Sequence, residues 1–242
     1  MLLVLTALLI GCQAPEVVLS GVIPETRFAD AGPLVGGTLS LRDAEGARYG
    51  QTTTAEDGSF SLGAPAGEAV FLEVSGGDAL VAASFSGVTG LAETLALDPA
   101  DRLLYGLTAA ELTAWRGRFA GCPGADAVGT AAVIGEVRVW ELADEAGEHP
   151  LVTKAWVELS AFSGARWTAC YLDDDGLAWS EGATYTGQTG VFAVFGLPAG
   201  GYSMEVSYLP HEEADPVTAW SELYLSAGGV APRFPAWVRW WA

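Results

Sequence analysis

The stretch AEDGSFSLGAPAGEAVFLEV, residues 55–74, decides the fold, because GQTGVFAVFGLPAGGYSMEV at 187–206 repeats its pattern. Apolar and polar residues alternate on both sides of a Pro-Ala-Gly turn, which is the period of a strand with one buried face. At an offset of 132 positions, Phe60 corresponds to Phe192. Polar positions between the apolar ones, such as Glu73, are expected to face outward. The pattern predicts one β-hairpin that occurs twice, with Phe60 and Phe192 each buried in its own core.

The strand before each hairpin repeats at a shorter offset. Leu39 and Leu41 in GTLSL correspond to Val157 and Leu159 in AWVEL, an offset of 118 positions. The second copy therefore holds about 14 additional residues before its hairpin, within 165–186. Loops accept insertions at small entropic cost and often carry function, so this insertion is the first candidate for a site.

These features resemble the carboxypeptidase regulatory-like, or transthyretin-like, β-sandwich family. The resemblance rests on an alternating Val/Leu strand, then DGSFSL or TGVFAV, then Pro-Ala-Gly, then FLEV or YSMEV. It covers most of residues 17–100 and 130–242, and it implies an antiparallel sandwich of about seven strands for each copy. It also implies modules that rigidify, space or bind, and that seldom catalyse.

The first residues indicate export. MLLVLTALLIG is apolar but shorter than the ~20 residues that a membrane-spanning helix needs. Leu9-Ile10-Gly11-Cys12 resembles the lipobox of bacterial lipoproteins, which implies cleavage before Cys12 and acylation of its sulfur and its new amino group. Two or more acyl chains anchor a protein stably to a membrane that it does not cross. A plain secretory signal with a chance cysteine is the alternative. Gln13 after Cys12 is compatible with sorting to the outer membrane.

The composition fits an exported, soluble module. The net charge is −19 with only 11 Lys and Arg, which repels polyanions, so nucleic acid is not an expected partner. Hydrophobic residues make up 50% of the chain and are interspersed with 31 Gly. This is ample core material interrupted by many turns, as in all-β proteins.

Two cysteines remain if Cys12 carries lipid. Cys122 and Cys170 lie 48 positions apart, and an oxidising compartment would allow them to form a disulfide bond. Such a bridge would stabilise the fold by ~2–4 kcal/mol in the chain-entropy model. Two independent buried thiols are the alternative. A zinc site is not indicated, because neither cysteine has a second Cys or a His two to four residues away.

One segment departs from the β pattern. LTAAELTAWRGRFAG, residues 107–121, begins with Thr108 as a candidate N-cap and has Glu111 three residues later, which is the capping-box spacing. Leu112 and Phe119 lie on one face at helical spacing. The segment predicts a short amphipathic helix between the sandwiches that packs on one of them. A membrane-surface helix is the alternative, and the narrow apolar face disfavours it.

Two features of the second copy are candidate binding sites. Asp173, Asp174 and Asp175 precede a glycine, and Ca²⁺ requires six to eight hard oxygen ligands. A solvated acidic turn is the alternative, because the twelfth position of a calcium loop holds Thr184 instead of Glu. No other cofactor is indicated.

Tryptophan is the second feature. All nine tryptophans lie at or after residue 115, and Trp167 and Trp179 flank the Asp run. Exposed aromatic rings stack on sugar rings, whereas buried ones build a core. Trp167, Trp179 and Trp240 are therefore the candidate glycan contacts, with a core role as the alternative.

No catalytic motif is present. The chain lacks a Gly-x-Ser-x-Gly elbow, a His-Glu-x-x-His zinc motif and a phosphate-binding glycine loop. Its two histidines, His149 and His211, lie in turn-like contexts beside prolines. We therefore expect a protein that is not an enzyme.

The sequence as a whole predicts an all-β lipoprotein of the cell envelope with two tandem antiparallel sandwiches of transthyretin-like or Ig-like type and one short intervening helix. It would act as a structural or binding module, with the membrane and a glycan or envelope protein as partners. A carbohydrate-binding module that uses the inserted loop and tryptophans is the alternative. The expected boundaries are a signal peptide at 1–11, a lipidated tether at 12–16, sandwiches at 17–100 and 130–242, and a linker with the helix at 101–129.

Overall fold

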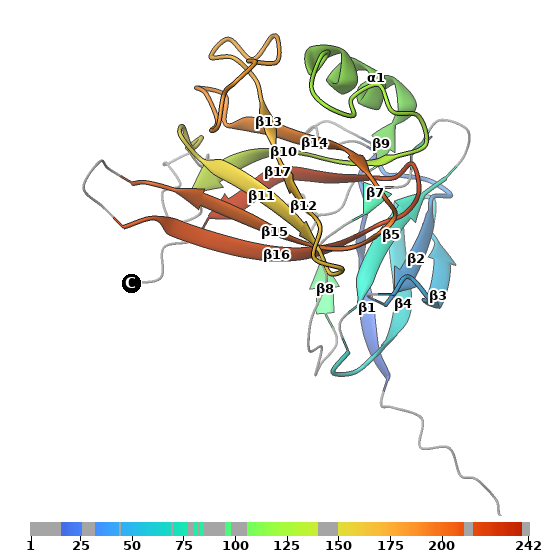
Figure 1. Ribbon diagram of the computed structural model, residues 1–242. Coiled ribbons are helices and arrows are strands. Elements are labelled where there is room, and N and C mark those ends of the chain that lie inside the picture. Colours follow the sequence, from blue (N-terminus) through green and yellow to red (C-terminus); the bar gives the residue numbers. More distant parts are fainter. Residues whose placement is uncertain are drawn as a thin grey trace, which may run out of the picture.

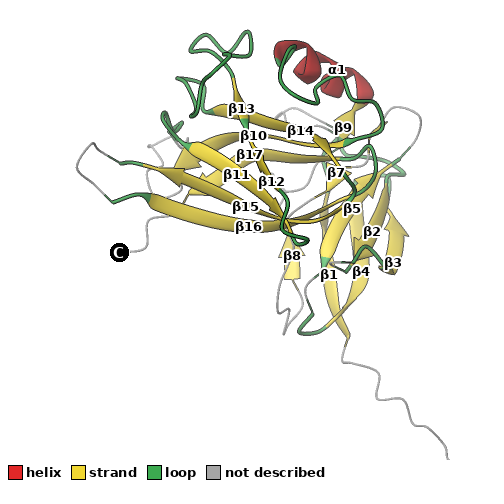
Figure 2. Cartoon of the chain, in the orientation of Figure 1, coloured by secondary structure: helices red, strands yellow, loops and turns green. Residues whose placement is uncertain are grey.

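The computed structural model describes residues 16–25, 32–43, 45–68, 70–76, 80–81, 83–84, 95–97, 106–139, 150–210 and 215–238. These residues are mostly β-strand, with one short helix (Figure 2). The first half contains β1 (Glu16–Val22), β2 (Thr38–Arg42), β3 (Arg48–Thr53), β4 (Ser59–Pro65), β5 (Phe71–Ser75), β6 (Leu80–Val81), β7 (Ala83–Ser84) and β8 (Leu95–Leu97). The second half contains β9 (Leu107–Thr108), α1 (Ala109–Arg118), β10 (Ala131–Val139), β11 (Trp156–Ala161), β12 (Arg166–Thr168), β13 (Cys170–Tyr171), β14 (Val191–Leu197), β15 (Gly200–Tyr208), β16 (Val217–Leu225) and β17 (Val230–Val238).

Two β-sandwiches have the same strand order. In the first, β4-β1-β8 faces β3-β2-β5-β7, and in the second, β14-β10-β17 faces β12-β11-β15-β16 (Figure 1). Gly21 lies opposite Phe60 across β1 and β4, and Gly135 lies opposite Phe192 across β10 and β14. Phe60 is 6% exposed and Phe192 is fully buried, each in a separate apolar cluster. The prediction of an all-β chain with two sandwiches is confirmed. The predicted hairpins are not: β4 and β5 lie in opposite sheets, as do β14 and β15, so each Pro-Ala-Gly turn crosses from one sheet to the other. The alternation specifies which face of each strand is buried, but it does not specify the strand that pairs with it.

Each sandwich departs from a purely antiparallel arrangement in one strand pair. Strand β8 pairs with β1 in parallel, and β17 pairs with β10 in parallel. All other pairs within the sandwiches are antiparallel. A parallel pair requires a long crossover between sheets, which the alternation of single strands does not reveal.

The two sandwiches share a sheet. Strand β17 pairs in parallel with β7, which joins the two halves into one sheet of order β13-β14-β10-β17-β7-β5-β2-β3. On one face of this junction the Tyr224 ring of β16 lies 6.4 Å from the Phe71 ring of β5. The Tyr224 ring also fills the space beside Gly46, where a methyl group would collide with it. The first sandwich is therefore held against the second by both backbone pairing and side-chain packing.

This contact corrects one expectation. Glu73 points out of its own sandwich, as predicted, yet it is only 6% exposed. The neighbouring Phe71 is also buried and contacts Tyr224, so this face of β5 is covered by the second sandwich. An Arg42 guanidinium nitrogen lies 3.2 Å from Glu73 Oε1 and compensates the buried charge.

The segment between the sandwiches forms a third layer. Helix α1 begins with the predicted capping box, in which Thr108 and Glu111 satisfy each other's backbone amides. Leu112 and Phe119 are buried, and the Phe119 ring lies 5.6 Å from the Phe195 ring of β14. The predicted linker therefore covers the outer face of β14 and β10 and is not a free connection. No helix among the described residues is long and apolar enough to span a membrane.

Candidate functional site

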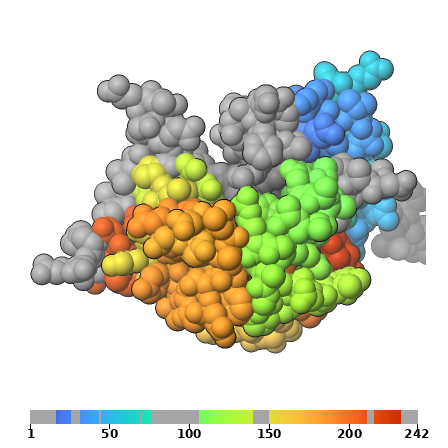
Figure 3. Space-filling view, turned by 90° about the horizontal axis from the view of Figure 1, so that it is seen from above, coloured from blue at the N-terminus to red at the C-terminus, as the bar shows by residue number. Residues whose placement is uncertain are grey.

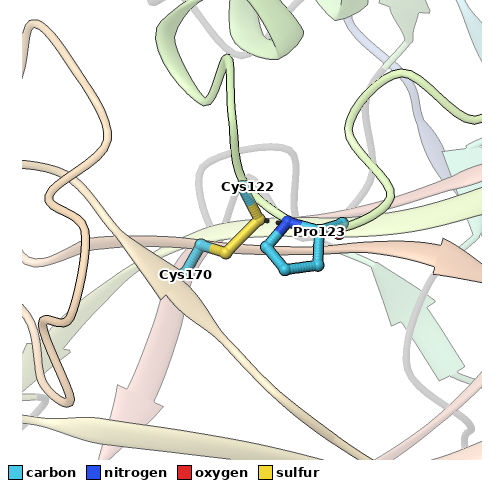
Figure 4. The surroundings of a disulfide bond; sticks show 3 residues. All are labelled: Cys122, Pro123 and Cys170. Carbon is cyan, nitrogen blue, oxygen red and sulfur yellow. Dashed lines mark hydrogen bonds between the residues drawn. A yellow bond between two sulfur atoms is a disulfide. The ribbon is translucent and has the colours of Figure 1, made fainter.

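The insertion in the second sandwich is built into the fold by a disulfide bond. Cys122, just after the helix, is bonded to Cys170 of β13, with the two Cα atoms 6.2 Å apart (Figure 4). Strand β13 has no counterpart in the first sandwich and extends the sheet beyond β14. Figure 3 shows the insertion, in orange, beside the segment that follows β9, in green. The bridge joins these two segments across 48 positions.

Trp179 of the insertion packs against the same segment. Its backbone amide donates to the carbonyl of Arg118 at 2.8 Å. Its ring lies over Gly121, where a Cβ atom would be 2.7 Å from the ring. Gly121 has φ +97°, a conformation that glycine adopts without strain. Trp179 is partly buried against the core cluster and does not form an open platform.

The acidic run shapes the insertion. The amide of Leu177 donates to Asp173 Oδ1 at 2.9 Å, and the amide of Gln188 donates to Asp174 Oδ1 at 3.0 Å. Asp175 is exposed. Within the described part of the chain, no three His, Cys, Asp or Glu side chains are grouped so that they could hold a metal ion. Two of the three carboxylates therefore serve as backbone acceptors that fix the turn.

A hollow of about 460 Å³ opens between the acidic turn and the tip of the insertion. Its walls include Asp173, Asp174, Glu181, Ser180 and Tyr185. Tyr185 is 50% exposed at the rim. The walls offer carboxylates and hydroxyls but no histidine or cysteine, so the hollow holds no recognisable set of catalytic groups.

One of the remaining candidate residues packs in a core, and the other three lie outside the described residues. Trp167 of β12 is partly buried, and its ring meets the Tyr202 ring edge to face at 5.6 Å. Trp240, His149 and His211 lie outside the described residues. The structure thus places Trp167 on β12 and Trp179 in the loop after β13, and it packs both against cores.

One exposed tryptophan was not predicted. Trp220 of β16 is 65% exposed and stands opposite Glu205 of β15. It lies on the outer face of the sheet β12-β11-β15-β16, because Leu223 and Leu225 of the same strand face the core. The alternation in TAWSELYL, residues 218–225, is the signal that places Trp220 outward.

Polar side chains surround Trp220 on this outer face. Glu158 of β11 lies opposite Glu205, and an Arg166 guanidinium nitrogen lies 2.9 Å from Glu158 Oε1. The Ser207 hydroxyl donates to Glu205 Oε1 at 3.3 Å and lies 2.7 Å from the Thr218 hydroxyl. Around the exposed Trp220 ring, the face therefore carries carboxylates and hydroxyls.

Comparison with known proteins gives no family. No protein-family model matches the chain, and no curated protein matches it in sequence. The resemblance to carboxypeptidase regulatory-like domains therefore remains a prediction.

Several solved structures are similar at low scores. The shaft pilin SpaA from Lactobacillus rhamnosus GG shares 10% identity over 94% of this chain and 98% of that chain, with a TM-score of 0.29. The minor pilin GBS52 from Streptococcus agalactiae shares 9% identity over 94% and 96%, with a TM-score of 0.27. The TIE protein of Bacillus anthracis shares 9% identity over 93% of this chain, with a TM-score of 0.29. The chain spans only 34% of the TIE protein. Similarity at this level carries no argument about function.

Proposed function

We propose that the chain is a lipid-anchored, non-catalytic protein of the bacterial envelope. The first sandwich acts as a spacer at the membrane, and the second sandwich presents the binding surface. The outer membrane is the proposed location, since Gln13 rather than Asp follows Cys12.

The observation that carries the proposal is the position of the first strand relative to Cys12. Strand β1 begins at Glu16, so three residues separate it from the cysteine of the lipobox-like motif. A fully extended chain gains about 3.3–3.6 Å per residue, so an anchor at Cys12 would hold the sandwich within about 15 Å of the membrane. In Figure 1, strand β1, which starts at Glu16, begins at the lower end of the first sandwich, and the second sandwich lies at its upper end. This geometry directs the second sandwich outward.

A non-catalytic role agrees with how the described residues use their polar groups. The carboxylates of Asp173 and Asp174 accept hydrogen bonds from loop amides. The hydroxyls of Thr54 and Thr186 are buried and bonded to the backbone. These groups hold loops in place and leave no activated nucleophile or base in the hollow of the insertion.

Mass spectrometry of the mature amino terminus tests the anchor. The chain is purified from the membranes of a bacterium that processes lipoproteins, and its amino-terminal peptide is sequenced. We expect the peptide to begin at Cys12 and to carry a diacylglyceryl group and an amide-linked acyl chain. A Cys12→Ser variant should lose this modification and leave the membrane fraction. A peptide that begins elsewhere, or an unmodified Cys12, would show a plain secretory signal and overturn the proposal.

A further inference from the structure

The same sheet face has different surroundings in the two sandwiches. In the first, the β5 part of the outer face is covered, with Phe71 and Glu73 buried and the Phe71 ring packed on Tyr224. In the second, Tyr224 at one end of the outer face of β16 makes this contact, whereas Trp220 on the same face is 65% exposed and Glu222 is exposed. Within the described residues, the two outer faces therefore meet at Phe71 and Tyr224, and the face around Trp220 is left exposed.

Strand register identifies the residues that replace one another on the two faces. Arg42 lies opposite Phe71 in the first sandwich, and Ser160 lies opposite Ser203 in the second. The Phe71 ring, which contacts the neighbouring sandwich, and the Arg42 guanidinium, which pairs with Glu73, are thus replaced by two serines. At these positions the second sandwich carries small hydroxyl side chains.

The second sandwich also has an aromatic ring at a register position where the first has none. Ser84 lies opposite Glu73 in the first sandwich, and Trp220 lies opposite Glu205 in the second. A tryptophan that is 65% exposed leaves a large apolar ring in water at a free-energy cost, which a ligand would remove. The exchange of serine for tryptophan adds a stacking surface where the first sandwich has a small polar residue.

The chemistry around Trp220 matches a polyol. Serine and threonine hydroxyls both donate and accept, and carboxylates accept, so both can bind the hydroxyl groups of a sugar. The face carries Ser160, Ser203, Thr218, Glu205 and Glu158. An aromatic ring supplies the apolar contact for the C–H face of a sugar ring.

Charge decides between neutral and charged ligands. The chain has a net charge of −19, and three glutamates lie on this face, so an anionic polymer would be repelled. A cationic peptide would be attracted by the same charge. However, Glu158 is paired with Arg166, so part of this charge is already compensated. The hydroxyls then dominate the face and favour a neutral sugar.

We propose that the outer face of the second sandwich binds a neutral polysaccharide, with Trp220 stacked on a sugar ring and Glu205 and Ser203 bonded to its hydroxyls. This inference rests on the proposed display role and names its ligand class. Stacking on Trp220 alone gives weak binding to one sugar chain. Many copies anchored in one membrane would bind a polymer through several contacts at once, which raises the effective affinity.

Affinity gel electrophoresis tests the proposal. The chain lacking residues 1–11 and carrying Cys12→Ala is run through native gels that contain laminarin, galactomannan or hydroxyethyl cellulose. We expect at least one of these neutral polymers to retard it. Trp220→Ala should weaken binding by about tenfold, which corresponds to about 1.4 kcal/mol. Trp220→Tyr should retain part of the affinity, because tyrosine keeps an aromatic face.

Tyr185→Ala is the matched control, because it removes another exposed aromatic ring, in the insertion, and should leave binding unchanged. Thermal melting of each variant checks the fold. Loss of binding in Tyr185→Ala but not in Trp220→Ala would place the site in the insertion and overturn the proposal. The absence of retardation by all three polymers, or retardation by polylysine alone, would also overturn it. These gels do not depend on an acyl group at Cys12, so failure here is distinct from failure of the anchor.

Discussion

Thr54 and Thr186 occupy the same position in the two sandwiches, 132 residues apart in the sequence. The Thr54 hydroxyl accepts from the amide of Gly37 at 2.8 Å, and the Thr186 hydroxyl accepts from the amide of Ala155 at 3.0 Å. Both threonines are buried in the loop before β4 or β14 and tie that loop to the residue before β2 or β11. The Thr186 hydroxyl also donates to the carbonyl of Val152 at 2.7 Å.

Replacement of either threonine by valine should destabilise the protein. Valine keeps the shape but leaves a buried amide without a partner, which costs about 1–3 kcal/mol. Thr186→Val should lower the free energy of unfolding more than Thr54→Val, because it removes two hydrogen bonds. Urea denaturation measures both changes. Thr53→Val, on the exposed position next to Thr54, is the control and should change stability little. Equal stability of all three variants would contradict a structural role for the two ties.

The duplicated strands are predictable from sequence because their pattern is local, although the two strands of each pair lie in opposite sheets and form no hairpin. Period-two alternation specifies which residues share a face, and the offsets of 118 and 132 positions agree with the observed pairing. Leu41 lies opposite Leu72, and Leu159 lies opposite Met204. The capping box of the helix is predictable for the same reason, since Thr108 and Glu111 are only three residues apart.

The contacts between sandwiches are not predictable in this way. The pairing of Ala83 with Val230 joins strands that are 147 positions apart, and nothing in either short segment indicates the partner. The burial of Glu73 follows from the packing of the second sandwich against this face of β5. Likewise, the position of Trp179 over Gly121 depends on how the insertion folds back on the helix segment. The tryptophan content of the sequence alone could not show that Trp179 is packed whereas Trp220 is exposed.

The glycines directly before β4 and β14 should tolerate alanine poorly. Gly58 has φ +76° and Gly190 has φ +65°, and alanine is strained in this region. A Cβ atom would also lie 2.8 Å from the Ile23 carbonyl oxygen at Gly58 and 3.0 Å from the Val137 carbonyl oxygen at Gly190. Gly58→Ala and Gly190→Ala should each lower the free energy of unfolding by about 1–3 kcal/mol.

Gly117→Ala is a control that should change the stability in the opposite direction. Gly117 lies in the helix, where a Cβ atom would meet no other atom within 4 Å. Gly117→Ala should stabilise by about 0.5–1 kcal/mol, because alanine loses less backbone entropy in a helix. Urea denaturation compares the three variants. A stability gain in Gly58→Ala or Gly190→Ala would be inconsistent with the turn geometry.

The disulfide bond should contribute substantially to stability. The bridge between Cys122 and Cys170 restricts the unfolded chain and holds the helix segment to the insertion. A double variant, Cys122→Ala with Cys170→Ala, should have a free energy of unfolding that is about 2–4 kcal/mol lower. It should therefore unfold at a lower urea concentration. Dithiothreitol should lower the stability of the wild-type chain and leave the double variant unchanged. Two free thiols in mass spectrometry of the non-reduced protein would refute the bridge.

High pH should destabilise the second sandwich through two buried tyrosines. Burial raises the pKa of Tyr171 to about 12, although the amide of Val157 donates to its hydroxyl and favours ionisation. Burial also raises the pKa of Tyr202 to about 12, and its hydroxyl donates to the carbonyl of Pro198 at 2.6 Å. Between pH 10, the ordinary value of an unfolded tyrosine, and pH 12, the folded state holds more protons than the unfolded state. Stability is therefore complete below pH 10 and falls as the pH rises toward 12.

Urea denaturation at several pH values between about 8 and 11.5 measures this dependence. The fall in unfolding free energy should be shallower in Tyr171→Phe and in Tyr202→Phe, because each removes one ionisable hydroxyl from the core. Both variants should also be less stable at pH 8, since Tyr171→Phe leaves the Val157 amide without its acceptor and Tyr202→Phe leaves the Pro198 carbonyl without its donor. Tyr185→Phe, which removes an exposed hydroxyl, should follow the wild-type curve. If both core variants also follow the wild-type pH dependence, these two hydroxyls do not determine the alkaline limit of the fold.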